Sequence, residues 1–136
     1  MARYAALIDG KAGGYGLTFP DLPGCTAMGA TIDAALAHAA EALRDWVEIT
    51  ATAGEAIPAP RPLEALRRDP EINAALAGGA VLAAVPLVRE TGKPTKANLS
   101  IDAGILSAID DEAKRQGLTR SAFVELMAKR AIPEMV

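Results

Sequence analysis

The C-terminal third of the chain holds one strand-like segment and two helix-like segments, and it offers the strand no partner. Residues 96–101 alternate strictly between apolar and polar side chains, which predicts a strand with one buried face. The apolar positions are Ala97, Leu99 and Ile101, and the polar positions are Lys96, Asn98 and Ser100. A lone strand with two short helices cannot close a hydrophobic core. We therefore expect two copies of the chain to pair these strands antiparallel in a two-fold dimer.

Two helices are predicted to follow this strand. Asp102 and Thr119 precede them and can act as N-caps, while Gly117 can end the first helix. After each cap, apolar residues recur every three or four positions, as a buried helix face requires. These residues are Ile105, Leu106, Ile109 and Ala113 in the first helix, and Phe123, Val124, Met127 and Ala131 in the second.

The polar face of the paired strands favours DNA binding. A two-stranded ribbon fits the major groove, where asparagine can pair with adenine, lysine with guanine and serine with several bases. The predicted base-reading residues are Lys96, Asn98 and Ser100. The start of the second helix, Thr119, Arg120 and Ser121, is predicted to bind a DNA phosphate, because a helix N-terminus presents unpaired N–H groups. The plainer alternative is an edge strand and a helical hairpin whose polar face only meets water.

This module resembles the ribbon-helix-helix DNA-binding family. The resemblance covers Lys96 to about Ile132, and the stretch GLTRSAFV (117–124) carries most of it. It implies a β-α-α fold that dimerises and binds DNA through the paired strands. Homodimerisation through residues 96–136 is expected, and the pairing of dimers into tetramers is left open.

The N-terminal half alternates strand signals with turn residues. Strands are predicted at 3–8, 15–19, 25–29 and 80–88. The glycine-rich segment 9–14 is predicted to be a hairpin loop, and 20–24, with two prolines and a glycine, a turn. The apolar run 80–88 predicts a strand buried on both faces, with Pro86 indicating a sheet edge.

A long helix is predicted from Thr31, which can cap it. Its apolar stripe consists of Ile32, Leu36, Ala39, Leu43, Trp46 and Val47. The helix must end within 52–62, because Gly54 and three prolines follow. Residues 63–79 fit either a short helix interrupted near Asp69 or an ordered loop, and 89–95 is predicted to be a linker.

The sequence holds little that could support catalysis or metal binding. Cys25 is the only cysteine and His38 the only histidine, so an intramolecular disulfide is excluded and a transition-metal site is disfavoured. Asp9, Asp21 and Asp33 could supply oxygen ligands to a hard cation, but each also fits a turn or a helix start. We expect no enzymatic activity, no metal and no cofactor.

The stretch GYGLTFPDLPGCTAMGATIDAALAHAAEAL (14–43) is similar to the HicB antitoxin family. The matching positions are Tyr15, Phe19, Pro20, Asp21, Leu22, Pro23, Gly24, Cys25, Gly29 and Thr31. Ala34 and Ala35 depart from a Glu-Ala pair that is common in the family. The likeness extends loosely through 55–60 to about residue 85.

This resemblance implies an α+β chain. Residues 1–88 would form a partial ribonuclease-H-like β-β-β-α-β domain without nuclease activity, followed by the linker 89–95 and the ribbon-helix-helix domain 96–136. Such front domains bind and neutralise a HicA-type, mRNA-cleaving toxin, while the tail represses the operon through operator DNA. Residues 1–88 hold six Lys and Arg against ten Asp and Glu, which is compatible with covering a basic, RNA-binding partner. The sequence does not identify the toxin-facing residues.

Two other functions are weighed against this one. A ligand-responsive repressor would keep the DNA-binding tail and use the front domain to sense a small molecule, and a ribonuclease-H-type enzyme ranks last. The N-terminal stretch MARYAALIDG contains an acid and no long apolar run, so no signal peptide is predicted. No segment approaches the ~18 apolar residues of a membrane span, so a cytoplasmic protein is expected.

Overall fold

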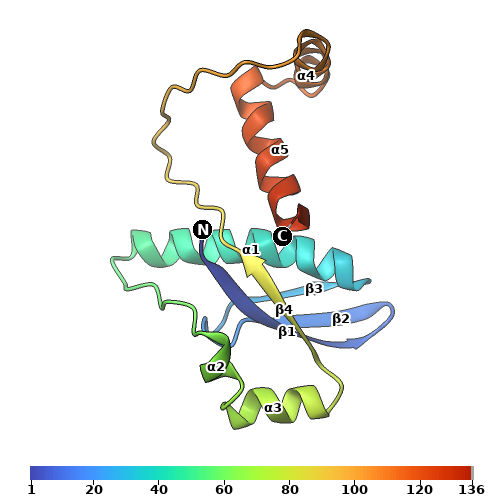
Figure 1. Cartoon of the computed structure of the whole chain (residues 1–136), viewed down its shortest axis with the longest axis vertical. Coiled ribbons are helices and arrows are strands. Elements are labelled where there is room, and N and C mark those ends of the chain that lie inside the picture. The colour runs from blue at the N-terminus through green and yellow to red at the C-terminus, as the bar shows by residue number, and fades with distance from the viewer. Residues whose placement is uncertain (136) are drawn as a thin grey trace. The chain divides into compact units, whose positions relative to one another are not determined.

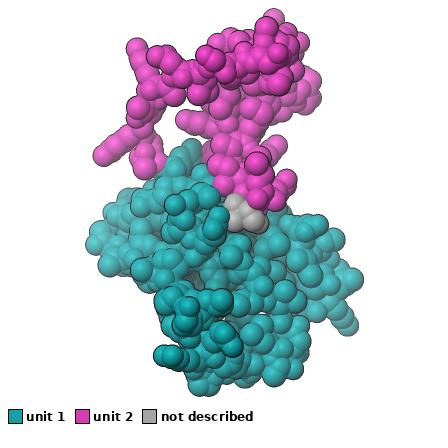
Figure 2. Space-filling view, in the orientation of Figure 1, with its two compact units in different colours: residues 1–90, 136 teal, residues 91–135 magenta. Residues whose placement is uncertain are grey.

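The computed structural model describes residues 1–135, which fall into two compact units. The N-terminal unit comprises Met1–Glu90 and the C-terminal unit Thr91–Met135 (Figure 2). The division between Glu90 and Thr91 falls inside the segment predicted to be a linker. Within the described residues, no helix combines the length and the apolarity that a membrane span needs.

The N-terminal unit is an antiparallel sheet with one long helix packed against it (Figure 1). Its elements are β1 (Arg3–Lys11), β2 (Gly14–Thr18), β3 (Thr26–Gly29), α1 (Ile32–Thr52), α2 (Leu63–Leu66), α3 (Pro70–Ala77) and β4 (Val81–Pro86). The strand order is β3-β2-β1-β4, and every neighbouring pair is antiparallel. The predicted β-β-β-α-β order is thus present, with two short helices inserted before the last strand.

The core lies between the sheet and α1. Alternation along β1 places Tyr4, Ala6 and Ile8 on the buried face, and Leu17 of β2 stands directly opposite Ile8. These side chains pack with Leu43 of α1 in one continuous apolar cluster. Because successive strand residues point to opposite faces, one alternating pattern per strand is enough to build this core.

Local chemistry fixes the start of α1, as predicted. The Thr31 hydroxyl accepts a hydrogen bond from the Ala34 N–H at 3.0 Å, which satisfies one of the donors that a helix N-terminus leaves unpaired. The predicted stripe packs on the core from the second turn onward, at Leu36, Ala39, Leu43, Trp46 and Val47. Ile32, the first residue of the predicted stripe, is exposed instead.

The first hairpin is tighter than predicted. The loop expected at 9–14 is wrong, because β1 continues to Lys11 and β2 begins at Gly14. Only Ala12 and Gly13 remain in the turn, and Gly13 adopts a positive φ of 93°. Cross-strand pairing extends the strands over glycines that read as loop residues when taken alone.

The last strand of this unit, β4, lies at the sheet edge beside β1, as Pro86 indicated. Its predicted burial on both faces is wrong: Val81 and Ala84 are exposed, and only Val85 and Pro86 are buried. The physical reason is that an antiparallel edge strand needs burial on only one face.

The ambiguous segment 63–79 is helical in two pieces. The break falls at Asp69, whose carboxylate accepts from the Glu71 N–H at 2.9 Å and so caps α3. Pro70 follows at the first helical position, where its missing N–H costs nothing. Leu66 and Ile72 are buried, one from each short helix.

The C-terminal unit contains α4 (Ala103–Arg115) and α5 (Arg120–Met135). Ala113 and Phe123 are buried, Val124 and Met127 are half-buried, and Ala131 is exposed rather than buried as predicted. The strand predicted at 96–101 is not formed in this single chain. A strand exists only through hydrogen bonds to a neighbour, and the module itself supplies none.

Candidate nucleic-acid interface

The turn between α4 and α5 is held by backbone hydrogen bonds. Gly117 has a positive φ of 70°, its N–H donates to the Lys114 carbonyl, and the Leu118 N–H donates to the Ala113 carbonyl. This pair of bonds is the Schellman pattern, which ends a helix at a glycine. At the other end of α4, Asp102 accepts from the N–H groups of Gly104 and Ile105 at 2.9 and 3.1 Å. Both predicted helix signals are confirmed.

The three predicted phosphate-binding residues have different surroundings. The Thr119 hydroxyl accepts from the Ala122 N–H at 3.1 Å and caps α5. Arg120 donates through Nε and Nη2 to the two carboxylate oxygens of Asp110, each at 2.8 Å. Ser121 is exposed. Arg120, predicted to bind a phosphate, is thus already paired with a carboxylate within the unit.

The three predicted base-reading residues, Lys96, Asn98 and Ser100, are all exposed. The apolar residues that alternate with them are exposed as well: Leu99 is 68% and Ile101 37% exposed. Ile105, which opens the predicted stripe of α4, is 58% exposed. The C-terminal unit therefore presents large apolar side chains to solvent along the segment and the helix that were predicted to form a dimer core.

A network that the sequence interpretation missed stabilises the N-terminal unit. Arg61 donates through its backbone N–H and through Nε to Asp21, at 3.0 and 2.5 Å, and through Nη1 to Asp69 at 2.8 Å. The Asp21 side chain is only 5% exposed. The network joins the turn after β2 to the start of α3. No periodicity connects two residues forty positions apart, so the sequence carried no signal for this contact.

Replacing Arg61 with alanine is expected to lower the free energy of unfolding by about 2 kcal/mol, because the buried Asp21 carboxylate loses its charged partner. The Arg61 hydrogen bond also holds the pKa of Asp69 below its usual range. The stabilisation from that pair is present above the ordinary aspartate pKa and is lost as the pH falls through the lowered value. The difference between variant and wild type should therefore shrink in acid.

Urea unfolding of both proteins at neutral pH and at about pH 3 measures this difference. Arg67→Ala is the matched control, because Arg67 is an exposed arginine of the same segment. An Arg61→Ala cost no larger than that of the control would contradict the role of the network.

The residues that were weighed for catalysis or metal binding occupy positions that the fold itself explains. Burial raises the pKa of the Cys25 thiol to about 11, so it is a poor nucleophile at neutral pH. His38 lies 2.7 Å, through Nδ1, from the Met28 carbonyl of β3. Asp9 lies in β1, Asp33 in the first turn of α1, and Asp21 binds Arg61. Among residues 1–135, no three His, Cys, Asp or Glu side chains gather where they could hold a metal ion.

Comparison with known proteins assigns the family. Residues 4–128 match the family described as HicB_like antitoxin of bacterial toxin-antitoxin system. The chain belongs to the HicB-like antitoxin family. A protein of Haemophilus phage HP1, described only as an uncharacterized 14.9 kDa protein of the rep-hol intergenic region, is 30% identical over 107 residues, covering 79% of this chain and 78% of the phage protein.

Solved HicB structures share the fold. The crystal structure of the Burkholderia pseudomallei antitoxin HicB is 32% identical, covers 96% of this chain and 98% of its own, and has a TM-score of 0.55. A chain from the HicA3 and HicB3 toxin-antitoxin complex is 25% identical, covers 63% of this antitoxin and 98% of its own length, and has a TM-score of 0.53. The mixed α+β architecture with an antiparallel sheet is therefore that of HicB antitoxins.

Proposed function

We propose that this HicB-like antitoxin neutralises a HicA-type toxin with its N-terminal unit and represses its own operon with its C-terminal unit. The C-terminal unit would act as a ribbon-helix-helix dimer on operator DNA. The observation that carries the dimer, on which the DNA-binding part depends, is the set of exposed apolar side chains at Leu99, Ile101 and Ile105. The toxin-binding part is supported by membership of an antitoxin family and by a relative that forms a toxin-antitoxin complex.

We expect these exposed apolar residues to be buried against a second copy of the same segment. In an antiparallel pair of 96–101 strands, the alternation directs Leu99 and Ile101 of both copies to one face. That face can then pack on the apolar sides of α4 and α5 from both chains. The same pairing supplies the backbone hydrogen bonds that a single 96–101 segment lacks. One dimer would therefore both cover the exposed apolar side chains and give the strand a partner.

The opposite face of this ribbon would carry Lys96, Asn98 and Ser100 twice, which is the base-reading surface. Their exposure in the single chain leaves them available for contact. Each pairs with base edges that the major groove displays, whereas the start of α5 would fix the register through phosphate contacts. One small module would thus supply both sequence reading and positioning.

Asn98→Ala is expected to weaken binding to operator DNA by about 1–3 kcal/mol and to leave binding to random-sequence DNA almost unchanged, because a bidentate contact to adenine exists only at the right base. Fluorescence anisotropy titrations on both duplexes at one fixed salt concentration measure the two losses. Equal losses on the two duplexes would show that Asn98 does not read a base.

Acidic side chains on α1 suit the proposed toxin partner. Glu41 and Asp45 lie one turn apart on α1, Asp33 lies in its first turn, and all three are exposed. A negative surface favours association with a basic, RNA-binding protein and speeds their encounter. These charges support a basic protein as the class of partner.

Co-expression with the neighbouring small reading frame tests the toxin-binding part. We expect that the neighbour arrests growth alone, is harmless with the antitoxin, and co-purifies with it. A neighbour that is not toxic, or that fails to bind, would overturn this part and favour a front domain that senses a small molecule. Binding of the purified antitoxin to DNA from upstream of its own gene tests the second part separately.

A further inference from the structure

A bidentate ion pair joins the two helices of the C-terminal unit. Asp110 lies in the second half of α4, and Arg120 is the first residue of α5. The two side chains meet in a bidentate ion pair, with both N···O distances 2.8 Å. The Arg120 side chain is 58% and the Asp110 side chain 43% exposed, so a nucleic acid can reach this pair.

We propose that Asp110 is a built-in competitor for the DNA phosphate, which holds Arg120 in a neutral pair and keeps DNA affinity low. The inference rests on the proposed DNA binding, and it concerns the regulation of that same site. A carboxylate presents the guanidinium with two oxygens in the geometry that a phosphate also offers. Asp110 and a DNA phosphate therefore compete for the same N–H groups of Arg120.

The Arg120 guanidinium keeps some N–H donors that a DNA phosphate could use. A guanidinium has five N–H donors, and the bond to Asp110 occupies Nε and one donor of Nη2. Nη1 stays available, so the paired arginine can still touch a phosphate, but the Asp110 charge beside it opposes the approach. The Arg120 hydrogen bond holds the pKa of Asp110 below its usual range, so this carboxylate is ionised at neutral pH.

Counterion release makes the competition measurable. A cation that neutralises a phosphate adds about 0.9 to the salt slope of binding on duplex DNA. The Arg120–Asp110 pair carries no net charge, so it adds little to the salt slope. Removing the Asp110 charge frees one cation in each copy, so the affinity should rise at low salt and the salt dependence should steepen.

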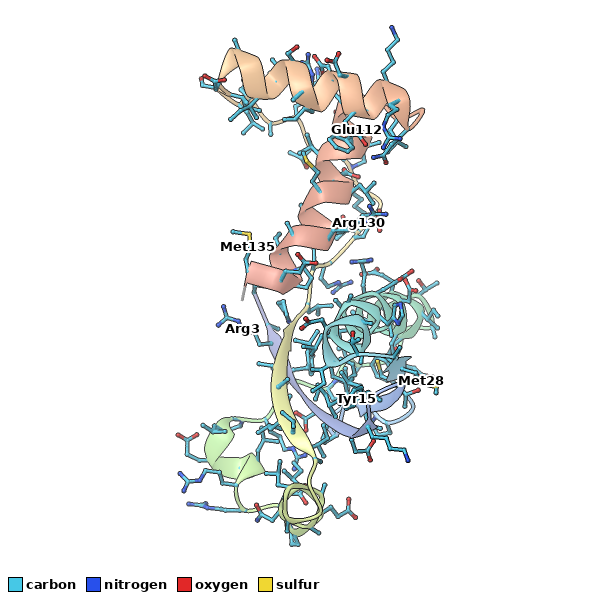
Figure 3. All side chains as sticks on the ribbon, turned by 90° about the vertical axis from the view of Figure 1, so that its right-hand side faces the viewer. Arg3, Tyr15, Met28, Glu112, Arg130 and Met135 are labelled. Atoms are coloured by element: carbon cyan, nitrogen blue, oxygen red, sulfur yellow. The ribbon has the colours of Figure 1, made fainter. Side chains whose placement is uncertain are left out.

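A second ion pair in the same unit provides a matched control. Glu112 of α4 (Figure 3) binds Arg115 three residues further on in the same helix. Glu112→Gln removes one negative charge and frees one arginine, as Asp110→Asn does, but Arg115 does not lie at the start of α5. The control separates competition at Arg120 from a general change of net charge.

The experiment measures binding of the full-length protein to a random-sequence duplex and to DNA from upstream of its own gene, over a range of KCl concentrations. Asp110→Asn should strengthen binding to both duplexes by about fivefold for each Arg120, the size of one exposed ion-pair contact. It should also steepen the salt slope by about 2 for a dimer. Glu112→Gln should change affinity less than twofold, and in an Arg120→Gln background Asp110→Asn should likewise change it less than twofold.

Several outcomes would overturn the inference. They are unchanged or weaker binding by both Asp110→Asn and Asp110→Ala, an equal gain from Glu112→Gln, or a gain of the same size without Arg120. Asp110→Ala is included because the asparagine of Asp110→Asn could still accept a hydrogen bond from Arg120. If the wild-type protein binds neither duplex at low salt, the proposed DNA binding fails together with this inference. If wild type binds and the Asp110 variants do not differ from it, only this inference fails.

Discussion

Replacing Gly29 with alanine is expected to destabilise the N-terminal unit by about 3 kcal/mol, the upper end of the cost of overpacking. Gly29 ends β3 and lies against the start of α1. A Cβ atom at this position would lie 2.3 Å from the Ala35 nitrogen, and 2.8 Å from both the Ala34 carbonyl carbon and the Ala35 Cα. These are backbone atoms of a helix, so neither a side-chain rotation nor a small local shift can relieve the overlap.

Thermal unfolding followed by circular dichroism measures this effect, and a fall in Tm of roughly 15 °C is expected for a unit of this size. Gly14→Ala is the matched control, because a Cβ at Gly14 meets nothing within 4 Å and Gly14 has no positive φ. A Gly29→Ala protein as stable as this control would mean that β3 and α1 are not held as close together as the structure shows.

Replacing Leu99 with glutamate is expected to abolish operator-specific DNA binding, with a loss of at least about 1,000-fold, because specific complexes exceed non-specific ones by that factor or more. In the single chain Leu99 is 68% exposed, so the new charge costs nothing there. In the proposed dimer, the two Leu99 side chains lie on the covered face of the ribbon, where two carboxylates would be buried without partners. The dimer should therefore dissociate, while the N-terminal unit, which has its own apolar core, stays folded.

Sedimentation equilibrium and anisotropy titrations on operator DNA report assembly and binding in parallel. Ile49→Glu is the matched control, since Ile49 is an apolar residue of α1 with 70% exposure and has no place in the proposed dimer. Full operator binding by a Leu99→Glu protein, or an equal loss in the Ile49→Glu protein, would refute the paired-strand arrangement.

These two changes address different units. Gly29→Ala acts on the sheet and helix of the proposed toxin-binding unit, whereas Leu99→Glu acts on the proposed DNA-binding unit. We expect the first to impair toxin neutralisation and the second to impair repression. A change in one unit that altered the function of the other would indicate that toxin and DNA binding are thermodynamically linked. In that case each partner changes the affinity for the other by the same factor.

The sequence by itself determined the features that depend on neighbours within a few positions. Thr31, Asp102 and Thr119 cap helices because a side-chain oxygen reaches an N–H only two or three residues away. Gly117 ends α4 because that position needs a positive φ. The stretch 14–43 pointed to the HicB antitoxin family, to which the chain belongs.

The tertiary structure decided the features that depend on residues far apart in the chain. Arg61 meets Asp21 across forty positions, and β1 extends through the glycines of its hairpin because β2 pairs with it. The sequence predicted a phosphate contact for Arg120 and gave no sign of Asp110, which the turn at Gly117 brings to it. The 96–101 segment has its strand pattern but no strand, because backbone hydrogen bonds need a partner that one copy of this chain does not provide. Residue spacing predicts which secondary structure a segment favours, whereas strands and ion pairs form only where a partner from elsewhere in the chain, or from a second chain, is present.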